Sequence, residues 1–239
     1  MLQNFWNIAL YKPLVNVLAF LTSVVPGGDV GLAIIILTII VKIVLYPLSQ
    51  KAIVGQAKMN ALAPLINKIK QSGANKEEQA KQTFELYKKH KTNPFSGCLL
   101  IFIQIPIIFA LYYVFLKGLS FDGGTLYSFI PVPSNINMSF LGLIDIHGKS
   151  LFLAILAGLS QYLQAYYMPK PAASTGDGTS FQDNFAKSMH LQMKYVFPFL
   201  ITFIAYSVSG AIALYWVTSN IFAVFQQIYA NKTKHLDLA

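Results

Sequence analysis

Long apolar runs alternate with lysine-rich and turn-rich stretches along this chain. An α-helix rises about 1.5 Å per residue, so roughly 20 apolar residues cross a hydrocarbon core of about 30 Å. Five runs approach or exceed this length and are predicted to be transmembrane helices: Val30–Leu48, Phe95–Leu116, Leu151–Met168, Leu191–Val208 and Ala211–Tyr229. Only Ser209 and Gly210 separate the last two runs, which predicts a tight hairpin within the membrane.

The chain before residue 29 is apolar but broken by polar positions. Lys12, Pro13 and Asn16 interrupt it, a pattern that favours an amphipathic helix lying on the outer membrane interface. A sixth span is the alternative. Residues 1–28 are therefore predicted to form an extracytoplasmic helix, followed by an all-α core of five spans over residues 29–239.

The distribution of lysines predicts the orientation of the spans. Residues 49–92 hold nine lysines and the loop 169–190 and the C-terminal part add five, against three on the opposite side. Lysine-rich loops stay in the cytoplasm, so the N-terminus is predicted outside and the C-terminus inside. Within 49–92, Gly73 and the capping pattern Asn75–Glu78 predict a helical hairpin. This hairpin suits either anionic lipid or the docking of clients and partners.

Composition places the chain among membrane proteins and argues against catalysis. Of its 239 residues 55% are hydrophobic and 11% charged, whereas a soluble domain carries about a quarter charged residues. The net charge is +9, and all 18 basic residues are lysines. A single cysteine and scattered histidines predict neither a disulfide nor a metal site. No nucleophile–base motif or phosphate loop is present, so neither an enzyme nor a cofactor is predicted.

Lys42 lies inside the first predicted span. A cation near the centre of a span costs about 2.5–3.5 kcal/mol on insertion scales, and no predicted span contains Asp or Glu to offset it. The other spans carry polar side chains at a similar depth, and with Lys42 and Thr38 these favour a hydrated cavity open to the cytoplasm: Gln104, Gln161, Thr202, Thr218 and Asn220. Two alternatives stay open: Lys42 reaches the cytoplasmic edge, and each polar residue makes an ordinary interhelical hydrogen bond.

Four segments together resemble the YidC–Oxa–Alb family of membrane protein insertases. They are Leu-Thr-Ile-Ile-Val-Lys-Ile-Val-Leu-Tyr-Pro-Leu (37–48), Asn-Pro-Phe-Ser-Gly-Cys (93–98), Gln-Ile-Pro-Ile-Ile-Phe-Ala-Leu-Tyr-Tyr (104–113) and Ser-Gly-Ala-Ile-Ala-Leu-Tyr-Trp-Val-Thr-Ser-Asn (209–220). The resemblance runs in order from about Trp6 to about Lys232. It implies a positively charged groove open to the cytoplasm and to lipid.

The resemblance also implies roles for single residues. Lys42 stands where the family has an arginine, which keeps the charge but loses the bidentate fork of a guanidinium. Thr38 and Gln104 match groove-lining positions. Tyr215 and Trp216 match an aromatic pair, and they are predicted to contact the client on a slide along the lipid-facing surface of the third and fifth spans.

The resemblance further implies an insertase and chaperone of the bacterial plasma membrane. Its predicted partners are nascent membrane proteins and the lipid bilayer; a Sec translocon and weakly bound ribosomes stay open as partners. The predicted insertase is expected to use no nucleotide, to read no nucleic acid and to work as a monomer. The alternatives are a small solute transporter or channel, which would show inverted repeats, and a chaperone that does not insert its clients.

Overall fold

The predicted apolar runs form helices in the computed structural model. It describes residues 6–73, 75–92, 96–116, 125–168, 188 and 191–237, with the backbone alone at 96–103 and 233–237. The α-helices are α2 (Lys12–Val24), α3 (Val30–Val44), α4 (Tyr46–Gln71), α5 (Lys76–Lys89), α6 (Ser96–Leu116), α7 (Leu151–Tyr167), α9 (Phe197–Ser207) and α10 (Gly210–Asp237). Shorter turns of helix are η1 (Asn7–Tyr11), η2 (Pro26–Gly28) and η3 (Gln192–Val196).

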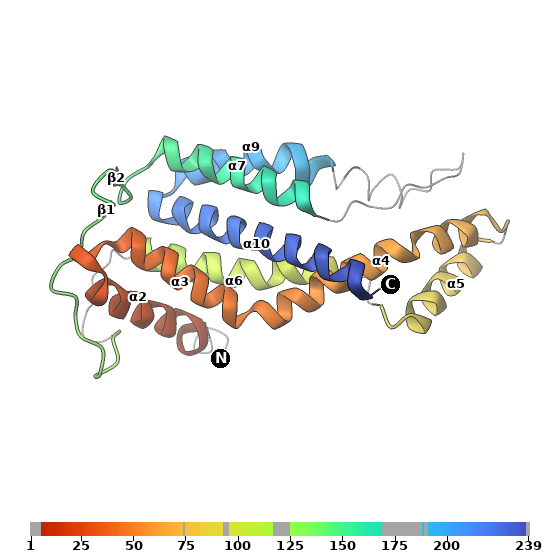
Figure 1. Cartoon of the computed structure of the whole chain (residues 1–239), viewed down its shortest axis with the longest axis horizontal. Coiled ribbons are helices and arrows are strands. Elements are labelled where there is room, and N and C mark those ends of the chain that lie inside the picture. Colours follow the sequence, from red (N-terminus) through yellow and green to blue (C-terminus); the bar gives the residue numbers. More distant parts are fainter. Residues whose placement is uncertain are drawn as a thin grey trace.

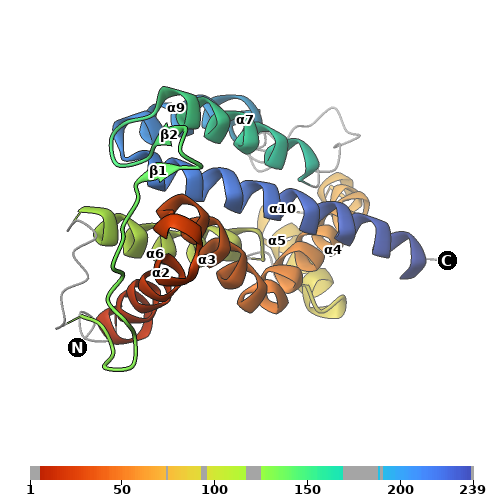
Figure 2. The same cartoon turned by 60° about the vertical axis from the view of Figure 1, so that its left-hand side comes forward.

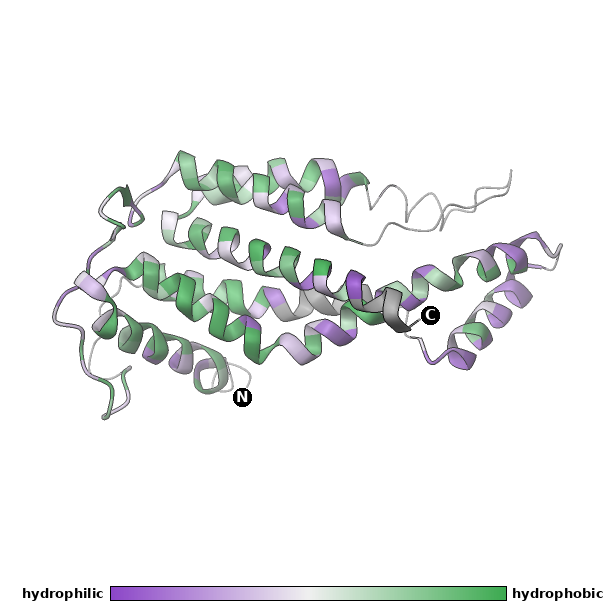
Figure 3. Ribbon diagram, viewed as in Figure 1, coloured by the Kyte–Doolittle hydropathy of each residue, from purple (hydrophilic) through white to green (hydrophobic). Residues whose placement is uncertain are grey.

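Helix α10 lies at the centre of the helix bundle. Figure 1 shows α7 and α9 side by side on one side of α10 and α3 and α6 on the other. The turned view in Figure 2 keeps this order, with α2 beside α3. The pair α4 and α5 extends from one end and is more polar than the bundle, where Figure 3 shows the apolar residues concentrated. The prediction of a mainly helical fold is therefore confirmed.

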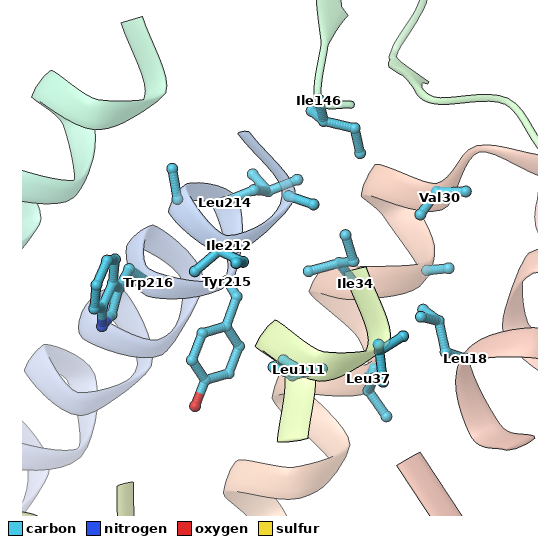
Figure 4. Packing of buried hydrophobic residues seen from close by; sticks show 14 of the residues in the cluster. Leu18, Val30, Ile34, Leu37, Leu111, Ile146, Ile212, Leu214, Tyr215 and Trp216 are labelled. Carbon is cyan, nitrogen blue, oxygen red and sulfur yellow. The ribbon is translucent and has the colours of Figure 1, made fainter. Parts of the chain in front are cut away.

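One apolar core joins the helices on both sides of α10. Small and branched side chains of α3 meet those of α6 and α10, and Figure 4 shows Ile34, Leu37, Leu111 and Ile212 in this cluster. Ile146, from the loop before α7, is fully buried in the same cluster. The apolar core therefore also anchors this loop at the end of the bundle.

The first predicted span is shorter than its apolar run. Helix α3 ends at Val44 and α4 begins at Tyr46, with a bend of 62° between their axes. Pro47 lies in the first turn of α4, where its missing N–H costs nothing, but its ring would clash with the carbonyl of residue 43 in a continuous helix. The structure therefore breaks the helix predicted over Val30–Leu48 at Leu45, whether or not the bent pair crosses as one span.

Helix length and composition alone identify fewer spans than the sequence predicts. Among the described residues, Asn7–Val24 and Gly210–Lys232 are long and apolar enough to cross a bilayer. The bent pair of α3 and α4 would be a third span if it crosses as one unit. Part of α6 over Gln104–Phe115 forms a shorter apolar helix. By length and composition alone, Asn7–Val24 also fits the sixth span that the sequence left open.

Two predicted connections are present in the structure. Between α4 and α5, Gly73 has a φ of +73°, and the Asn75 side chain accepts a hydrogen bond from the Glu78 amide at 2.8 Å. Between α9 and α10 the chain turns within Val208 and Ser209, as the short spacing predicts. Both helical hairpins follow from local sequence signals.

The loop before α7 is more regular than predicted. It contains a two-stranded antiparallel hairpin of β1 (Ser139–Phe140) and β2 (Ile144–Asp145). The glycines Gly123 and Gly124 and the prolines Pro131 and Pro133 predict an irregular loop over Lys117–Lys149. The hairpin depends on contacts with the start of α3, which no local pattern indicates.

Candidate functional site

Lys42 lies near the C-terminal end of α3 and reaches across to α6. Its Nζ donates a hydrogen bond to Oε1 of Gln104 at 3.2 Å, and Nε2 of Gln104 donates to the hydroxyl of Tyr215 on α10 at 2.6 Å. Ser219, one turn after Tyr215, lies 3.4 Å from the same Gln104 nitrogen. An ammonium group only donates, so the glutamine turns its carbonyl to the lysine and its amide to the tyrosine.

The charge of Lys42 is hydrogen-bonded but not neutralised within the described part of the chain. Gln104 is a neutral acceptor, and Lys42 forms no ion pair with any residue described there. Both side chains are half-buried, so they keep some access to the surroundings of the bundle. This arrangement offers a cation and amide and hydroxyl groups to a polar ligand.

The predicted aromatic pair does not lie on the surface of the bundle. Tyr215 is 1% exposed and Trp216 is 8% exposed, and both belong to the apolar core. Figure 4 shows the two rings leaving α10 in different directions. A lipid-facing slide needs exposed side chains, so this structure does not support their placement on such a slide. Tyr215 instead joins the hydrogen-bond network of Lys42.

The predicted threonines satisfy their hydroxyl groups within their own helices. Thr38 is 1% exposed and donates to the carbonyl oxygen of Ile34 at 2.7 Å. Thr202 and Thr218 likewise donate to carbonyl oxygens four residues earlier, each at 2.9 Å. Such bonds satisfy the hydroxyl group of a threonine within an apolar helix. Thr38 lies one turn before Lys42, as predicted, but its hydroxyl donates within α3 and not to the network.

Asn220 and Gln161 belong to a second polar cluster, between α10 and α7. Nδ2 of Asn220 donates to Oγ of Ser160 at 3.1 Å and to Oε1 of Gln161 at 3.3 Å. The structure therefore divides the predicted polar set between opposite sides of α10. Lys42 and Gln104 lie on one side, and Asn220 and Gln161 lie on the other.

A third polar cluster joins α10 to the start of α4, and sequence reasoning missed it. Nε2 of Gln226 donates to Oγ of Ser49 at 2.8 Å and lies 3.4 Å from Oε1 of Gln50. Tyr215, Ser219 and Gln226 are spaced by four and seven residues, so they share one face of α10. That spacing was the available signal. It indicates a polar seam that runs from the core of the bundle to the bend after α3.

Gln226→Leu is expected to lower stability by about 1–2 kcal/mol, the range of interhelical hydrogen bonds in model membrane helices. The change strips Ser49 and Gln50 of a partner at the point where α4 leaves α3. Thermal unfolding in detergent measures it. Gln192→Leu, at an exposed position, is the matched control. Equal melting of the two variants would show that the cluster contributes nothing.

Comparison with known proteins identifies the family. The sequence pattern of the family described as "60Kd inner membrane protein" matches residues 20–237. The "Membrane protein insertase YidC" of Fusobacterium nucleatum is 34% identical over 226 residues, which cover 93% of this chain and 97% of that protein. The protein of the same name from Clostridium tetani is 33% identical over 232 residues, which cover 95% of this chain and 93% of its own length. The chain belongs to the YidC family of membrane protein insertases.

A solved structure agrees with this assignment at the level of the fold. The structure described as "Active YidC insertase crystal structure with the first transmembrane domain resolved" matches with a TM-score of 0.50 and 22% identity. The match covers 82% of this chain and 40% of that chain, so this chain corresponds to less than half of that protein. Membership of the YidC family makes this chain a multi-pass protein of the bacterial plasma membrane.

Proposed function

We propose that this YidC-family chain inserts and helps to fold small membrane proteins. The observation that carries the proposal is the link from Lys42 through Gln104 to Tyr215, which holds an unneutralised cation among neutral polar groups. A YidC relative that matches nearly the whole chain is named a membrane protein insertase. In this proposal Lys42 and Gln104 line a hydrophilic groove open to cytoplasm and lipid.

The proposed topology has five spans, with the N-terminus outside and the C-terminus inside. Helix α2 then lies on the outer interface, and α4 with α5 forms a cytoplasmic hairpin. The asymmetry of the lysines supports this orientation, because residues 49–92 alone hold nine of the 18. Figure 3 shows that α5 and the far part of α4 are largely hydrophilic, which supports a position of this hairpin outside the membrane. The loop 169–190 belongs to the same side.

The proposed mechanism moves the polar end of a client through the groove. Leaving bulk water costs a polar segment free energy unless hydrogen-bond partners replace the solvent. Lys42, Gln104 and enclosed water supply such partners over part of the membrane. Transfer of the client's own apolar span into lipid then drives its release to the outside. The path through the groove crosses only part of the bilayer, so clients have short translocated segments. The transfer uses no nucleotide.

The client's apolar segment is proposed to lie along α7 and α10. The buried rings of Tyr215 and Trp216 cannot contact it directly, so exposed residues of the same two helices take this role. Leu159 and Leu163 on α7 and Phe225 on α10 are exposed by 60%, 42% and 68%. A client span that covers these side chains replaces lipid tails that are equally apolar, so the gain in free energy is small. Such weak binding suits transient contact.

Several associations belong to the same proposal. Nascent membrane proteins are the clients, and a Sec translocon and weakly bound ribosomes are further partners. The unit of function is the monomer. Insertion by this route needs neither a cofactor nor covalent chemistry, since binding and transfer free energies drive it.

Reconstitution into protein-free liposomes tests the proposal. A single-span client with a short acidic N-terminal segment is added, and protection of that segment from external protease is measured. Liposomes with this chain are expected to protect the segment several-fold more than empty liposomes. A client with a long hydrophilic segment is the control and should stay accessible. Equal protection in empty liposomes would contradict the insertase, and improved client folding without protection would favour a chaperone.

A further inference from the structure

The turn between β1 and β2 presents two leucines away from the bundle. Leu141 is 58% exposed and Leu143 is 84% exposed, the highest value among the exposed large apolar residues of the described chain. Leu141 also has a φ of +53°, in the left-handed region that bulky side chains rarely occupy. Exposed apolar surface and an uncommon backbone conformation thus coincide at one turn.

The Asp29 carboxylate ties this turn to the start of α3. Oδ1 of Asp29 accepts from the Leu32 amide at 3.1 Å and caps α3, and Oδ2 accepts from the Leu141 amide at 2.8 Å. The Phe140 ring packs directly on Gly31, where any side chain would overlap it. The left-handed conformation of Leu141 therefore persists because tertiary contacts with α3 determine it.

The base of the hairpin is tied to α10 as well. The Ile146 amide donates to Met138 at 2.9 Å, and the Ala211 amide at the start of α10 donates to Ile146 at 3.0 Å. Ile146 is fully buried between them. The turn is consequently fixed at the end of the bundle where α3, α7 and α10 begin, and Figures 1 and 2 show β1 and β2 at this end.

We propose that this turn inserts Leu141 and Leu143 into the outer leaflet of the phospholipid bilayer. The proposal rests on the proposed orientation of the spans. Residues 138–144 contain no charged side chain, which suits the acyl region of lipid. Two leucines are far fewer than the roughly 20–30 residues per side of a stable protein interface, which disfavours a protein partner. At the same end of the bundle, Phe152 in the first turn of α7 is also exposed, by 59%.

Lipid contact explains why the turn has leucine at position 141, where glycine or asparagine would be less strained. Leu141 and Leu143 leave water when the turn enters the leaflet, and this transfer favours the observed conformation. The turn then fixes the ends of α3 and α10 relative to the outer membrane surface. The Lys42 network lies further along the same two helices, so this anchor sets its depth in the bilayer.

Fluorescent labelling tests the proposal directly. Cys98, the single cysteine of the chain, is replaced by serine, and Leu143→Cys is labelled with an environment-sensitive dye in phospholipid liposomes. Ser134→Cys, an exposed polar position of the same loop, is the matched control. The label at 143 is expected to emit at shorter wavelength, to be quenched by spin-labelled lipid and to be quenched several-fold less by aqueous iodide than the label at 134.

Equal iodide quenching at the two positions would overturn lipid insertion and leave the turn as a water-exposed surface. Orientation is read separately, from the side on which a membrane-impermeant thiol reagent reaches Ser134→Cys. Reaction from the cytoplasmic side alone would contradict the proposed orientation and, with it, insertion into the outer leaflet. Lipid quenching at 143 would still show that the turn enters the bilayer in that case. Client insertion by the unlabelled Cys98→Ser chain tests the proposed function independently of both results.

Discussion

Lys42→Glu is expected to abolish insertion of clients whose translocated segment is acidic. Two unit charges 4 Å apart interact by about 4 kcal/mol at an effective dielectric constant of about 20. The change replaces an attraction by a repulsion, and a fraction of that energy already corresponds to more than a tenfold loss of rate, at about 1.4 kcal/mol per factor of ten. Growth of a strain depleted of its own insertase and protease protection of the client both measure the loss.

Matched variants separate charge from packing at position 42. Lys42→Arg keeps the cation and is expected to retain activity, although a planar guanidinium bonds Gln104 differently. Lys42→Met removes the charge, keeps most of the volume and should give an intermediate loss. For a client with a basic segment the order should reverse, with Lys42→Glu the better variant. Full activity of both Lys42→Met and Lys42→Glu with acidic clients would exclude an electrostatic role.

The helices of this fold were predictable because their signals are local. Apolar runs, Gly73 and the Asn75 cap act within a few residues, and the structure places helix ends close to them. Pro47 is a similar local signal, and the bend between α3 and α4 lies next to it. The β1–β2 turn was not predictable, since Leu141 adopts its conformation through a bond to Asp29, 112 residues earlier.

Lys42 and Gln104 were predictable as polar residues of the spans, but which of the predicted polar residues meet one another was not. A lysine inside an acid-free span signals a polar partner, and Gln104 is that partner in the structure. Which face of α10 meets which neighbour depends on how the helices pack. The resemblance implied a lipid-facing position for Tyr215, which is buried here and completes the Lys42 network. Gln226 and Ser49 were missed for the same reason, because 177 residues separate them.

Gly158→Ala is expected to destabilise the pair formed by α7 and α9. A Cβ at Gly158 would overlap the hydroxyl oxygen of Thr202 and approach the backbone oxygen of Pro198 to 2.9 Å. Backbone atoms cannot yield as a flexible side chain can, so the helices must separate. Forcing extra atoms into a packed core typically costs about 1–3 kcal/mol. Unfolding in mixed detergent micelles measures the loss. Gly148→Ala is the control, because its nearest contact would be at 3.9 Å.

A double-mutant cycle with Thr202 then decides what this threonine does. Thr202→Ala removes the hydroxyl that Gly158→Ala would meet, so the double variant should regain part of the lost stability, with Pro198 still too close for full recovery. Thr202 also donates its hydroxyl to Pro198, which satisfies it without a ligand. Normal client insertion by Thr202→Ala alone would therefore assign Thr202 to the packing of α7 and α9. A specific loss of insertion at unchanged stability would instead return it to the groove.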